Sequence, residues 1–599
     1  MKKFTSIIMT LTLCLNTFGQ SISNKDLKHN IDDLFQSYSN YDRFIGSVLI
    51  SQDDTIIYQK SFGYADVESQ RPNTAQSIFS IASVTKTITG VAIMKLVDDG
   101  ALTLDTPIST YFPRFIPKYS KDITVRHLLN HSSGMQANIG RIDDEGNGLV
   151  LGENEITMDE LIELFQESQL KFEPGTGYEY NNFGYTLLAN IIEKVSGQSY
   201  ADYLEQSIFI PAGMKNSSVD TFKILDEIAF PHTGLGLNAF KKHTPSIHLS
   251  WIKGAGNLNA TAIDLYNFMR SLNSGILLKP ESVDKLYNVS QPTGINDTEY
   301  GLGWSIEHRG GEKWINHSGL LPGSASIMGF LPEKNIKIII LSNATSTKLD
   351  AKDDFQGKRE FVSGAIIDNV IAAVQGKRPE LLPMQVNNSN KEDYNQSYDL
   401  DDMHSLTFKK QGNNYTLEST GSDSWSIFTY AFSKNAKEDN KASEIASFFA
   451  NAFSTQDFNG LSDFGSEEMK TFFGSEDGIK QLKGIWSYFL EQAGAFKSYN
   501  IYNIEGENTK TVNIRFHFEK NDVGIVLSIN KENLIQGMFN DDTVKTSHVS
   551  KVVLTPIGKD EFFINGHQNG GMQDLRVSLT EDDLVLIDNS IKFNAKRRN

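Results

Sequence analysis

The sequence is poor in cysteine, in long apolar runs and, relative to its acidic residues, in basic ones. Only Cys14 among 599 residues is a cysteine, so a disulfide framework and cysteine-based metal or thiol chemistry are excluded from the rest of the chain. Lys and Arg number 56 against 74 Asp and Glu, a formal net charge of -18. That balance argues against a nucleic-acid partner, which requires a basic face.

Apolar residues form a long run only at the beginning of the sequence. Met1 is followed by two lysines, an apolar stretch extends from Phe4 to Phe18, and Gly19 is a small residue at its exit. This layout predicts a signal peptide over residues 1–20 and a protein secreted across the inner membrane, most simply a periplasmic one. Beyond it, no apolar stretch reaches the roughly 18–20 residues that a transmembrane helix needs.

The stretch from Ser80 to Met94 predicts a helix with a serine at its beginning. Apolar residues recur at helical spacing, and Gly100 closes the run. Ser83 would lie in the first turn with Lys86 one turn later on the same face. Because desolvation lowers the pKa of a lysine, Lys86 could take the proton of the Ser83 hydroxyl, and helix N-terminal N–H groups could stabilise negative charge.

The Ser-x-x-Lys spacing does not identify the nucleophile by itself. It occurs at four other places, namely Ser168/Lys171, Ser250/Lys253, Ser282/Lys285 and Ser528/Lys531. The choice among them depends on partners elsewhere in the chain.

The wider pattern predicts two strands, a long helical insertion, three more strands and a final helix. This order favours an α/β (α+β) fold in which an antiparallel sheet is flanked by its terminal helices and carries an inserted all-α lobe, with the site in the cleft between them. The expected strands are Phe44–Ile50, Thr55–Tyr58, Trp314–Leu320, Ala325–Leu331 and Ile336–Asn343, and the final helix is Phe361–Val374.

Three motifs, in this order, resemble those of the serine β-lactamase and penicillin-binding-protein family. They are Ser83-Val84-Thr85-Lys86, Tyr180-Asn181-Asn182 and His317-Ser318-Gly319. The resemblance covers residues 24–376 and is closest to the branch of class C β-lactamases, D-Ala-D-Ala carboxypeptidases, esterases and D-aminopeptidases. It implies a β-lactamase-like fold and a serine hydrolase.

The resemblance also implies roles for the first two motifs. Ser83 would be the acylated nucleophile, and Lys86 the base or proton shuttle. Tyr180 would exchange protons with Ser83 and the leaving group. Asn182 would form hydrogen bonds with Lys86 and with the substrate amide.

The third motif would bind the substrate along a strand that includes His317 and Ser318. Gly319 would let the substrate backbone approach closely, and the N–H groups of Leu320 and Ser83 would form the oxyanion hole. A similar run at residues 131–134 precedes Tyr180 and matches this motif in letters only.

The chain departs from the family's pattern at His317, where many penicillin-recognising members have lysine. A histidine is mostly neutral at pH 7, so we expect weaker anchoring of a substrate carboxylate. Leu320 makes the adjacent wall apolar. The histidine resembles the esterase, aminopeptidase and β-lactamase-like branches more than a dedicated β-lactamase, and at the position of Leu320 small or polar residues are frequent in β-lactamases. For the remaining histidines of the insertion, His127 and His131, we expect packing roles at a helix end and in a loop.

Composition changes after the expected catalytic domain. Residues 377–397 read as a linker. Residues 398–430 and 546–599 contain short strand patterns and together predict one small β domain split by an insertion. Between them, residues 440–545 combine two amphipathic helices with alternating strands and resemble, in outline, the nuclear-transport-factor-like α+β cone. Its Trp486, Tyr488 and Phe489 favour core packing over a ligand pocket.

Taken together, the residues predict an exported serine hydrolase that acts through an acyl-enzyme on an ester or amide. D-residue peptides and cell-wall fragments are the candidate substrates. One alternative is a β-lactamase or D-Ala-D-Ala carboxypeptidase, and a second is a non-catalytic muropeptide-binding or sensor protein. No cofactor and no metal are expected. The partner is a small molecule or peptide, and the sequence leaves the oligomeric state open.

Overall fold

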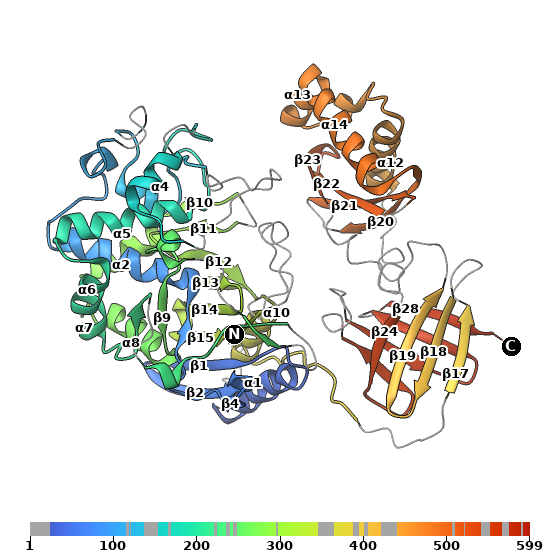
Figure 1. The fold of residues 1–599 in the computed structure, drawn as a ribbon, viewed down its shortest axis with the longest axis horizontal. Coiled ribbons are helices and arrows are strands. Elements are labelled where there is room, and N and C mark those ends of the chain that lie inside the picture. Colours follow the sequence, from blue (N-terminus) through green and yellow to red (C-terminus); the bar gives the residue numbers. More distant parts are fainter. Residues whose placement is uncertain are drawn as a thin grey trace, which may run out of the picture.

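The computed structural model describes most of the chain from Asn24 onward (Figure 1). The predicted signal peptide, the centre of the predicted linker at 387–393, and residues 421–430 and 541–550 of the predicted C-terminal domains lie outside the described residues. Among the described residues, no helix is both long enough and apolar enough to cross a lipid bilayer. The described residues are 24–114, 119, 121–136, 154–165, 169–220, 224–234, 240–243, 248–294, 297–345, 364–386, 394–399, 405–420, 440–505, 509–519, 522–540, 551–565, 574–588 and 591–598.

An eight-stranded sheet with antiparallel neighbours forms the centre of the first domain, in the order β10-β11-β12-β13-β14-β15-β1-β2. Strand β15, the last strand of this sheet along the chain, pairs with β1 of the first hairpin. The bounds are β1 Gly46–Gln52, β2 Thr55–Phe62, β10 Gln291–Pro292, β11 Glu299–Tyr300, β12 Ser305–Arg309, β13 Glu312–Leu321, β14 Ser324–Leu331 and β15 Ile336–Ser342.

Helices cover both faces of this sheet. On one face α1 (Asn24–Ser39) and α10 (Gly364–Val374) pack together over apolar side chains of β1, β14 and β15. On the other face a larger core joins the sheet to the helical lobe. Strands β1 and β15 are buried along almost their whole length and have apolar centres, Val48–Ile50 and Ile338–Leu341, because both of their faces are covered. The predicted β-lactamase-like fold, a sheet flanked by its terminal helices, is confirmed.

The part of the chain inserted between strands β2 and β10 forms a lobe that is mainly helical (Figure 1). It also contains strands of two or three residues, which the sequence pattern did not indicate. The helices are α2 Thr85–Asp98, α3 Val125–Leu129, α4 Met158–Phe165, α5 Asn182–Ser196, α6 Tyr200–Leu204, α7 Ile210–Ala212, α8 Ala262–Asn273 and α9 Pro280–Asn288. The short strands of the domain are β3 Tyr64–Asp66, β4 Arg71–Pro72, β5 Phe79–Ser80, β6 Ser218–Val219, β7 His232–Thr233, β8 Lys241–Lys242, β9 Leu258–Ala260 and β16 Ala344–Thr345.

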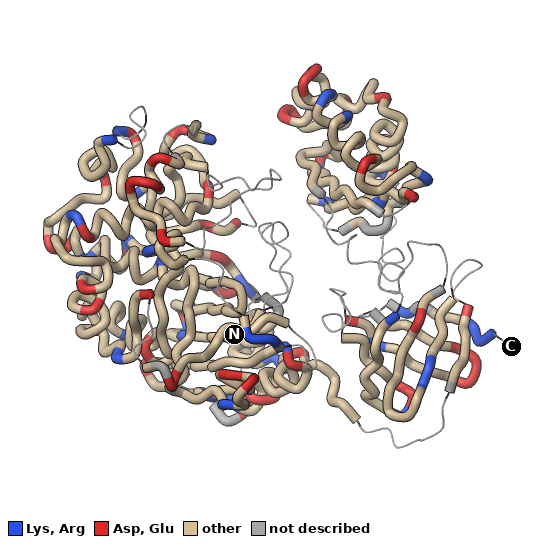
Figure 2. Tube along the Cα trace, viewed as in Figure 1, with Lys and Arg blue, Asp and Glu red and all other residues tan. Residues whose placement is uncertain are grey.

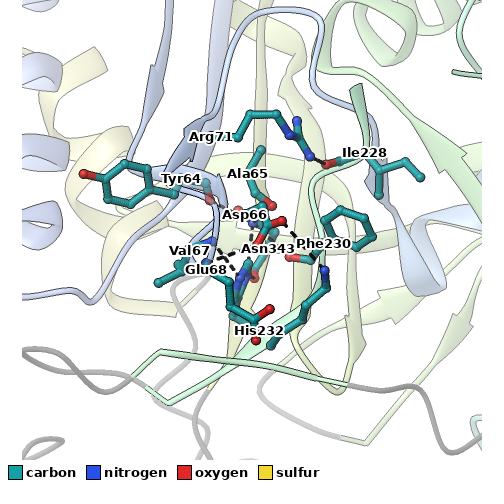
Figure 3. Close-up of polar contacts among 11 residues, drawn as sticks. Tyr64, Ala65, Asp66, Val67, Glu68, Arg71, Ile228, Phe230, His232 and Asn343 are labelled. Atoms are coloured by element: carbon teal, nitrogen blue, oxygen red, sulfur yellow. Dashed lines mark hydrogen bonds and ion pairs between the residues drawn. The ribbon is translucent and has the colours of Figure 1, made fainter. Parts of the chain in front are cut away.

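A cluster of buried polar side chains connects three loops of this domain (Figure 3). The amide of Asn343 donates to the carbonyls of Tyr64 and Phe230, both at 3.0 Å. His232 is fully buried, and its Nε2 accepts the N–H of Val67 at 3.2 Å. Side chains thus satisfy main-chain groups that no regular strand or helix pairs, which buried backbone requires.

A closed eight-stranded barrel follows, built from two parts of the chain. Its strands run in the order β17-β18-β19-β24-β25-β26-β27-β28, and β17 closes on β28 through the pair Tyr398 and Arg597. The bounds are β17 Tyr394–Asp399, β18 Ser405–Gln411, β19 Asn414–Thr420, β24 Lys551–Pro556, β25 Glu561–Ile564, β26 Leu575–Leu579, β27 Asp583–Asp588 and β28 Ile591–Arg597.

Between β19 and β24 the chain forms an α+β unit in which helices cover one face of a four-stranded antiparallel sheet. Trp486 and Phe489 belong to its core, as expected, whereas Tyr488 is exposed. The bounds are α12 Asn440–Thr455, α13 Glu467–Gly474, α14 Glu476–Ala493, β20 Phe496–Glu505, β21 Lys510–Phe518, β22 Asp522–Ile529 and β23 Ile535–Asn540.

The barrel contacts the first domain through the loop between α1 and β1. Arg43 is 6% exposed and donates to Asn565 at 2.6 Å and to Asp574 at 2.7 Å. Next to it, the ring of Tyr41 packs edge-on against Phe563 with centroids 5.2 Å apart. A buried charge-assisted contact therefore joins the two domains.

Candidate active site

Ser83 lies where strand β5 leads into helix α2. It is the middle residue of a short 3-10 turn, Ala82–Val84, directly before α2. Ala82 has a left-handed φ of 46°, a conformation that is costly for a residue other than glycine and that clusters at functional turns. The predicted nucleophile is therefore presented on a sharp turn at the beginning of a helix.

Lys86 is 0% exposed and its amine contacts Ser83. Nζ lies 3.0 Å from Ser83 Oγ and donates to the carbonyl of Ala255 at 2.8 Å. Burial lowers the pKa of Lys86 well below its usual value. A lysine in this state can accept a proton from the hydroxyl it contacts.

The second motif lies at the beginning of helix α5. Lys86 Nζ is 4.8 Å from the centre of the Tyr180 ring. Asn181 caps the helix by accepting the N–H of Gly184 at 3.1 Å, and Asn182 is the first residue of α5. Of the described residues, Ser83 and Ala255 supply the hydrogen-bond partners of Lys86, so the expected contact between Asn182 and Lys86 is replaced by one to a main-chain carbonyl.

The third motif lies on β13, directly beside the nucleophile. A Cβ atom at Gly319 would stand 2.8 Å from the nitrogen of Ser83, so only glycine lets this strand approach the turn. Ser326 on the neighbouring strand β14 donates to the carbonyl of Ile81 at 2.6 Å and ties the sheet to the same turn. Leu320 follows on β13 and is partly buried, whereas Ser318 is exposed.

His317 is held as a neutral imidazole. Its Nδ1 lies 2.6 Å from its neighbour's carbonyl, that of Ser318, so Nδ1 donates and Nε2 accepts the hydroxyl of Tyr300 at 2.8 Å. Burial, and secondarily the charge of Lys86, lowers the pKa of His317 to about 3. This side chain therefore provides no positive charge for a substrate carboxylate at neutral pH.

Four tyrosines, here called the tyrosine cluster, surround these groups with His131 at their centre. His131 is 1% exposed, and its ring centre lies 4.5 Å from those of both Tyr180 and Tyr300. The sequence predicts a packing role for His131 and contains no motif that includes Tyr300. Only the aromatic richness of residues 178–185 pointed toward such a cluster, whose members are Tyr178, Tyr180, Tyr185 and Tyr300.

A pocket of about 290 Å³ opens beside the cluster and continues along the sheet. Its far end carries Arg309 and Glu307, whose side chains are 3.2 Å apart. Arg309 also donates to Asp368 of α10 at 2.8 Å. Two carboxylates thus oppose one guanidinium there. The lining residues are Tyr178, Tyr180, Thr293, Thr298, Tyr300, Ser305, Glu307, Arg309, Asn316, His317, Ser318 and Ile327.

Charged side chains elsewhere are distributed over all parts of the described chain, with basic and acidic residues interspersed (Figure 2). Among the described residues, no three or more His, Cys, Asp or Glu side chains are grouped as metal ligands would be.

The chain matches known families in two regions. The family described as Beta-lactamase matches residues 31–362, and a protein family of unknown function, DUF3887, matches residues 446–538. A putative penicillin-binding protein of Bacillus subtilis (strain 168) is 32% identical over 315 residues, which cover 52% of this chain and 74% of that protein. Another penicillin-binding protein of the same strain is 29% identical over 330 residues, or 53% of this chain and 72% of that protein.

Two solved structures are similar to this one. The D-amino acid amidase from Ochrobactrum anthropi SV3, complexed with D-phenylalanine, is 26% identical and has a TM-score of 0.50; the match covers 59% of this chain and 99% of that chain. The octameric penicillin-binding protein homologue from Pyrococcus abyssi has a TM-score of 0.51 and covers 96% of this chain and 100% of its own. At 20% identity, the second likeness concerns the fold alone.

Proposed function

The chain belongs to the β-lactamase family of serine hydrolases, and on that premise we propose that it forms an acyl-enzyme at Ser83 on an ester or amide substrate. The observation that carries the proposal is the contact of 3.0 Å between Ser83 Oγ and the fully buried amine of Lys86. Of the five Ser-x-x-Lys pairs, this one adjoins the tyrosine of the second motif and the strand of the third.

In the proposed reaction, Lys86 takes the proton of Ser83 Oγ as the oxygen attacks the substrate carbonyl. The carbonyl oxygen becomes negative and is stabilised by the N–H groups of Ser83 and Leu320. Tyr180, which faces the Lys86 amine, passes the proton to the leaving group, and the bond to that group breaks. Water then attacks the acyl-enzyme with the same groups as base, and Ser83 regains its proton.

Asn182, His317, Ser318 and Gly319 are proposed to hold the substrate. Gly319 gives the substrate backbone room beside the nucleophile, and Ser318 offers an exposed hydroxyl at the pocket. Asn182 is the first residue of α5, two positions after Tyr180, and we assign it to the substrate amide. His317 fixes the hydroxyl of Tyr300 at the wall.

The charges around the pocket favour esters and amides over substrates that end in a free carboxylate. His317 is neutral, and Arg309 is engaged by the carboxylates of Glu307 and Asp368. A substrate carboxylate would meet no uncompensated cation among the described residues that line the pocket, so its desolvation would be unfavourable. The similarity to a D-amino acid amidase supports amides of D-residues, or cell-wall fragments that contain them, as substrates.

A β-lactamase or D-Ala-D-Ala carboxypeptidase activity is the second candidate. The observation in its favour is the similarity to two penicillin-binding proteins. We further propose that residues 1–20 direct export to the periplasm, and that the barrel and the α+β unit are accessory domains in the order given by the sequence. The barrel begins with β17 at Tyr394, so the predicted linker 377–397 is a few residues too long at its end.

Labelling with a fluorophosphonate probe, followed by peptide mapping, tests the nucleophile. The expected adduct is on Ser83, and Ser83→Ala is expected to abolish it. Ser250→Ala is the matched control, because Ser250 and Lys253 have the same spacing in the same domain. An adduct elsewhere, or equal labelling of the Ser83→Ala variant, would rule out the proposed nucleophile.

A substrate panel then separates the activities. D-amino-acid anilides and aryl esters are expected to turn over faster than D-Ala-D-Ala peptides or a cephalosporin. Rapid cephalosporin turnover would favour the second candidate. Ligand binding that survives Ser83→Ala, with no turnover by the wild type, would instead support a non-catalytic muropeptide-binding or sensor protein.

A further inference from the structure

His131 holds the backbone on both sides of Tyr180. Its own carbonyl accepts the N–H of Glu179 at 2.9 Å, and its Nδ1 accepts the N–H of Asn181 at 3.1 Å. Tyr180 lies between these two amides. One residue therefore fixes the N–H groups of the residues directly before and after the tyrosine of the second motif.

The imidazole of His131 also packs against the side chains that line the site. Its ring centre is 4.5 Å from Tyr180 and 4.5 Å from Tyr300. Tyr180 in turn lies under the amine of Lys86, and Tyr300 donates to His317. A change in the position of this imidazole would therefore be passed to both sides of the pocket.

The protonation state of His131 follows from its contacts. Because Nδ1 accepts an N–H, the proton of the neutral ring is on Nε2, and that buried nitrogen has no hydrogen-bond partner in the described part of the chain. Burial is the main cause that lowers the pKa of His131 well below its usual value. The ring therefore adds no charge to a site where Lys86, His317 and the four tyrosines already face it.

The backbone of His131 has a left-handed φ of 60°, which histidine adopts at a cost. Such conformations persist where the surrounding contacts impose them, often beside an active site. Here those contacts are the two bonds to residues 179 and 181.

We propose that His131 is a positioning residue for acyl transfer: it sets the distance of Tyr180 from the Lys86–Ser83 pair and does not itself exchange protons with the substrate. The inference rests on the proposed function of Ser83.

Three substitutions test the role of the imidazole. His131→Phe keeps a ring but removes the acceptor for the Asn181 amide. His131→Asn keeps an acceptor oxygen near the position of Nδ1 and tolerates the left-handed backbone. His131→Gln moves the acceptor away by one methylene and serves as the second test should the phenylalanine variant not fold.

His232→Phe is the matched control. His232 is also fully buried, and its Nε2 also accepts a backbone N–H, that of Val67 at 3.2 Å. It differs in its location, because it belongs to the cluster of buried polar side chains that joins the loops of β3, β7 and β16 (Figure 3). It reports the cost of losing a buried histidine that lies outside the tyrosine cluster.

We expect His131→Phe and His131→Gln to lower kcat by ~10- to 100-fold with KM little changed, since small displacements of a reacting group have effects of this size. The acid limb of the kcat/KM profile should move to higher pH, because a displaced Tyr180 ring exposes Lys86 to water, and the pKa of that amine, which burial holds low, then rises. His131→Asn should recover most of kcat. His232→Phe should lower Tm and leave kcat unchanged.

The proposal is overturned if His131→Phe or His131→Gln retains the wild-type kcat and pH profile, if His131→Asn is as impaired as His131→Phe, or if His232→Phe loses kcat equally. Probe labelling separates this outcome from failure of the proposed function. An unlabelled wild-type Ser83 refutes the nucleophile, whereas equal labelling rates in the wild type and His131→Phe refute only the positioning role.

Discussion

Two clusters of buried aromatic rings can be compared within this chain. In the α+β unit, Trp486 packs 5.3 Å from Phe453 and 5.2 Å from Phe496. In the tyrosine cluster, His131 packs 4.5 Å from Tyr180 and Tyr300. The spacing is similar, but the first cluster is almost entirely hydrocarbon, whereas the second surrounds a buried amine and two neutral imidazoles with phenol hydroxyls.

The difference shows what separates a core from a site. Aromatic density by itself stabilises a fold through the burial of apolar surface. Burial of the Lys86 amine does not stabilise the fold in this way, because desolvation of a cation costs free energy. The tyrosine cluster therefore retains groups that are unfavourable for stability, which is typical of sites maintained for chemistry.

Lys86→Met would convert the tyrosine cluster into an ordinary core. We expect a ~10³- to 10⁴-fold loss in kcat, the size expected for removal of an acid–base group. Tm should be unchanged or higher, because the buried amine is replaced by an apolar chain of similar length. Probe acylation rates and thermal unfolding measure both effects. A clear fall in Tm would contradict the comparison.

Trp486→Ala would disturb the hydrocarbon cluster. The expected loss is about 3–5 kcal/mol in the free energy of unfolding of the α+β unit, with turnover at 25 °C unchanged. Denaturant unfolding and a steady-state assay provide the measurements. Tyr488→Ala is the control, because Tyr488 is exposed and lies two residues after Trp486 on the same helix. This substitution should change stability by less than ~0.5 kcal/mol. A parallel loss of turnover would show that the α+β unit participates in the reaction.

Tyr300→Phe tests whether hydroxyls distinguish the clusters. It removes the donor to His317 Nε2, and a buried acceptor left without its partner costs about 1–3 kcal/mol. We expect kcat/KM to fall by roughly tenfold, equivalent to ~1.4 kcal/mol, together with a lower Tm. Tyr287→Phe, a substitution outside the tyrosine cluster, should change neither. Wild-type kinetics in Tyr300→Phe would leave the His317 contact without a functional role.

The pH dependence of stability tests the two neutral imidazoles of the tyrosine cluster. The pKa of His317 is lowered to about 3 in the folded protein and lies near 6.5 when unfolded. Between these values the unfolded chain binds the additional proton, so stability is fully present above about pH 6.5 and falls as the pH decreases. His131 acts in the same direction. The expected slope is about 1.4 kcal/mol per pH unit for each histidine.

Tm measured from pH 7 to pH 4.5 checks this dependence, and His317→Gln should flatten it. If the wild type and His317→Gln lose stability in parallel, His317 does not remain neutral in the folded protein.

The sequence identified the parts of the fold whose residues carry a local pattern. The five expected strands form one contiguous part of the observed sheet, β13-β14-β15-β1-β2, which ends at the edge strand β2. Their apolar runs made them recognisable, because apolar side chains face the helices that cover the sheet. Strands β10 and β11 have only two residues each, too few for any periodicity.

The sequence predicted those residues of the candidate site that belong to the three motifs. Tyr300 was missed because it lies on the two-residue strand β11 and reaches His317 only through the folded sheet. The second partner of Lys86 was missed because it is the carbonyl of Ala255, and a main-chain atom leaves no trace in residue identity. For His131, the local pattern of a helix end outweighed contacts with residues about 50 positions away.

The split barrel has a consequence for the timing of synthesis. Strand β19 ends at Thr420, and its partner β24 begins at Lys551. At ~5–20 residues per second, a translating ribosome needs roughly 7–26 s to produce the intervening stretch. Throughout that interval the edge of β19 has no partner, and an unpaired edge invites association with other chains. Rapid, independent folding of the α+β unit would shorten the span that the late strands must bridge, so its stability bears on the yield of the whole protein.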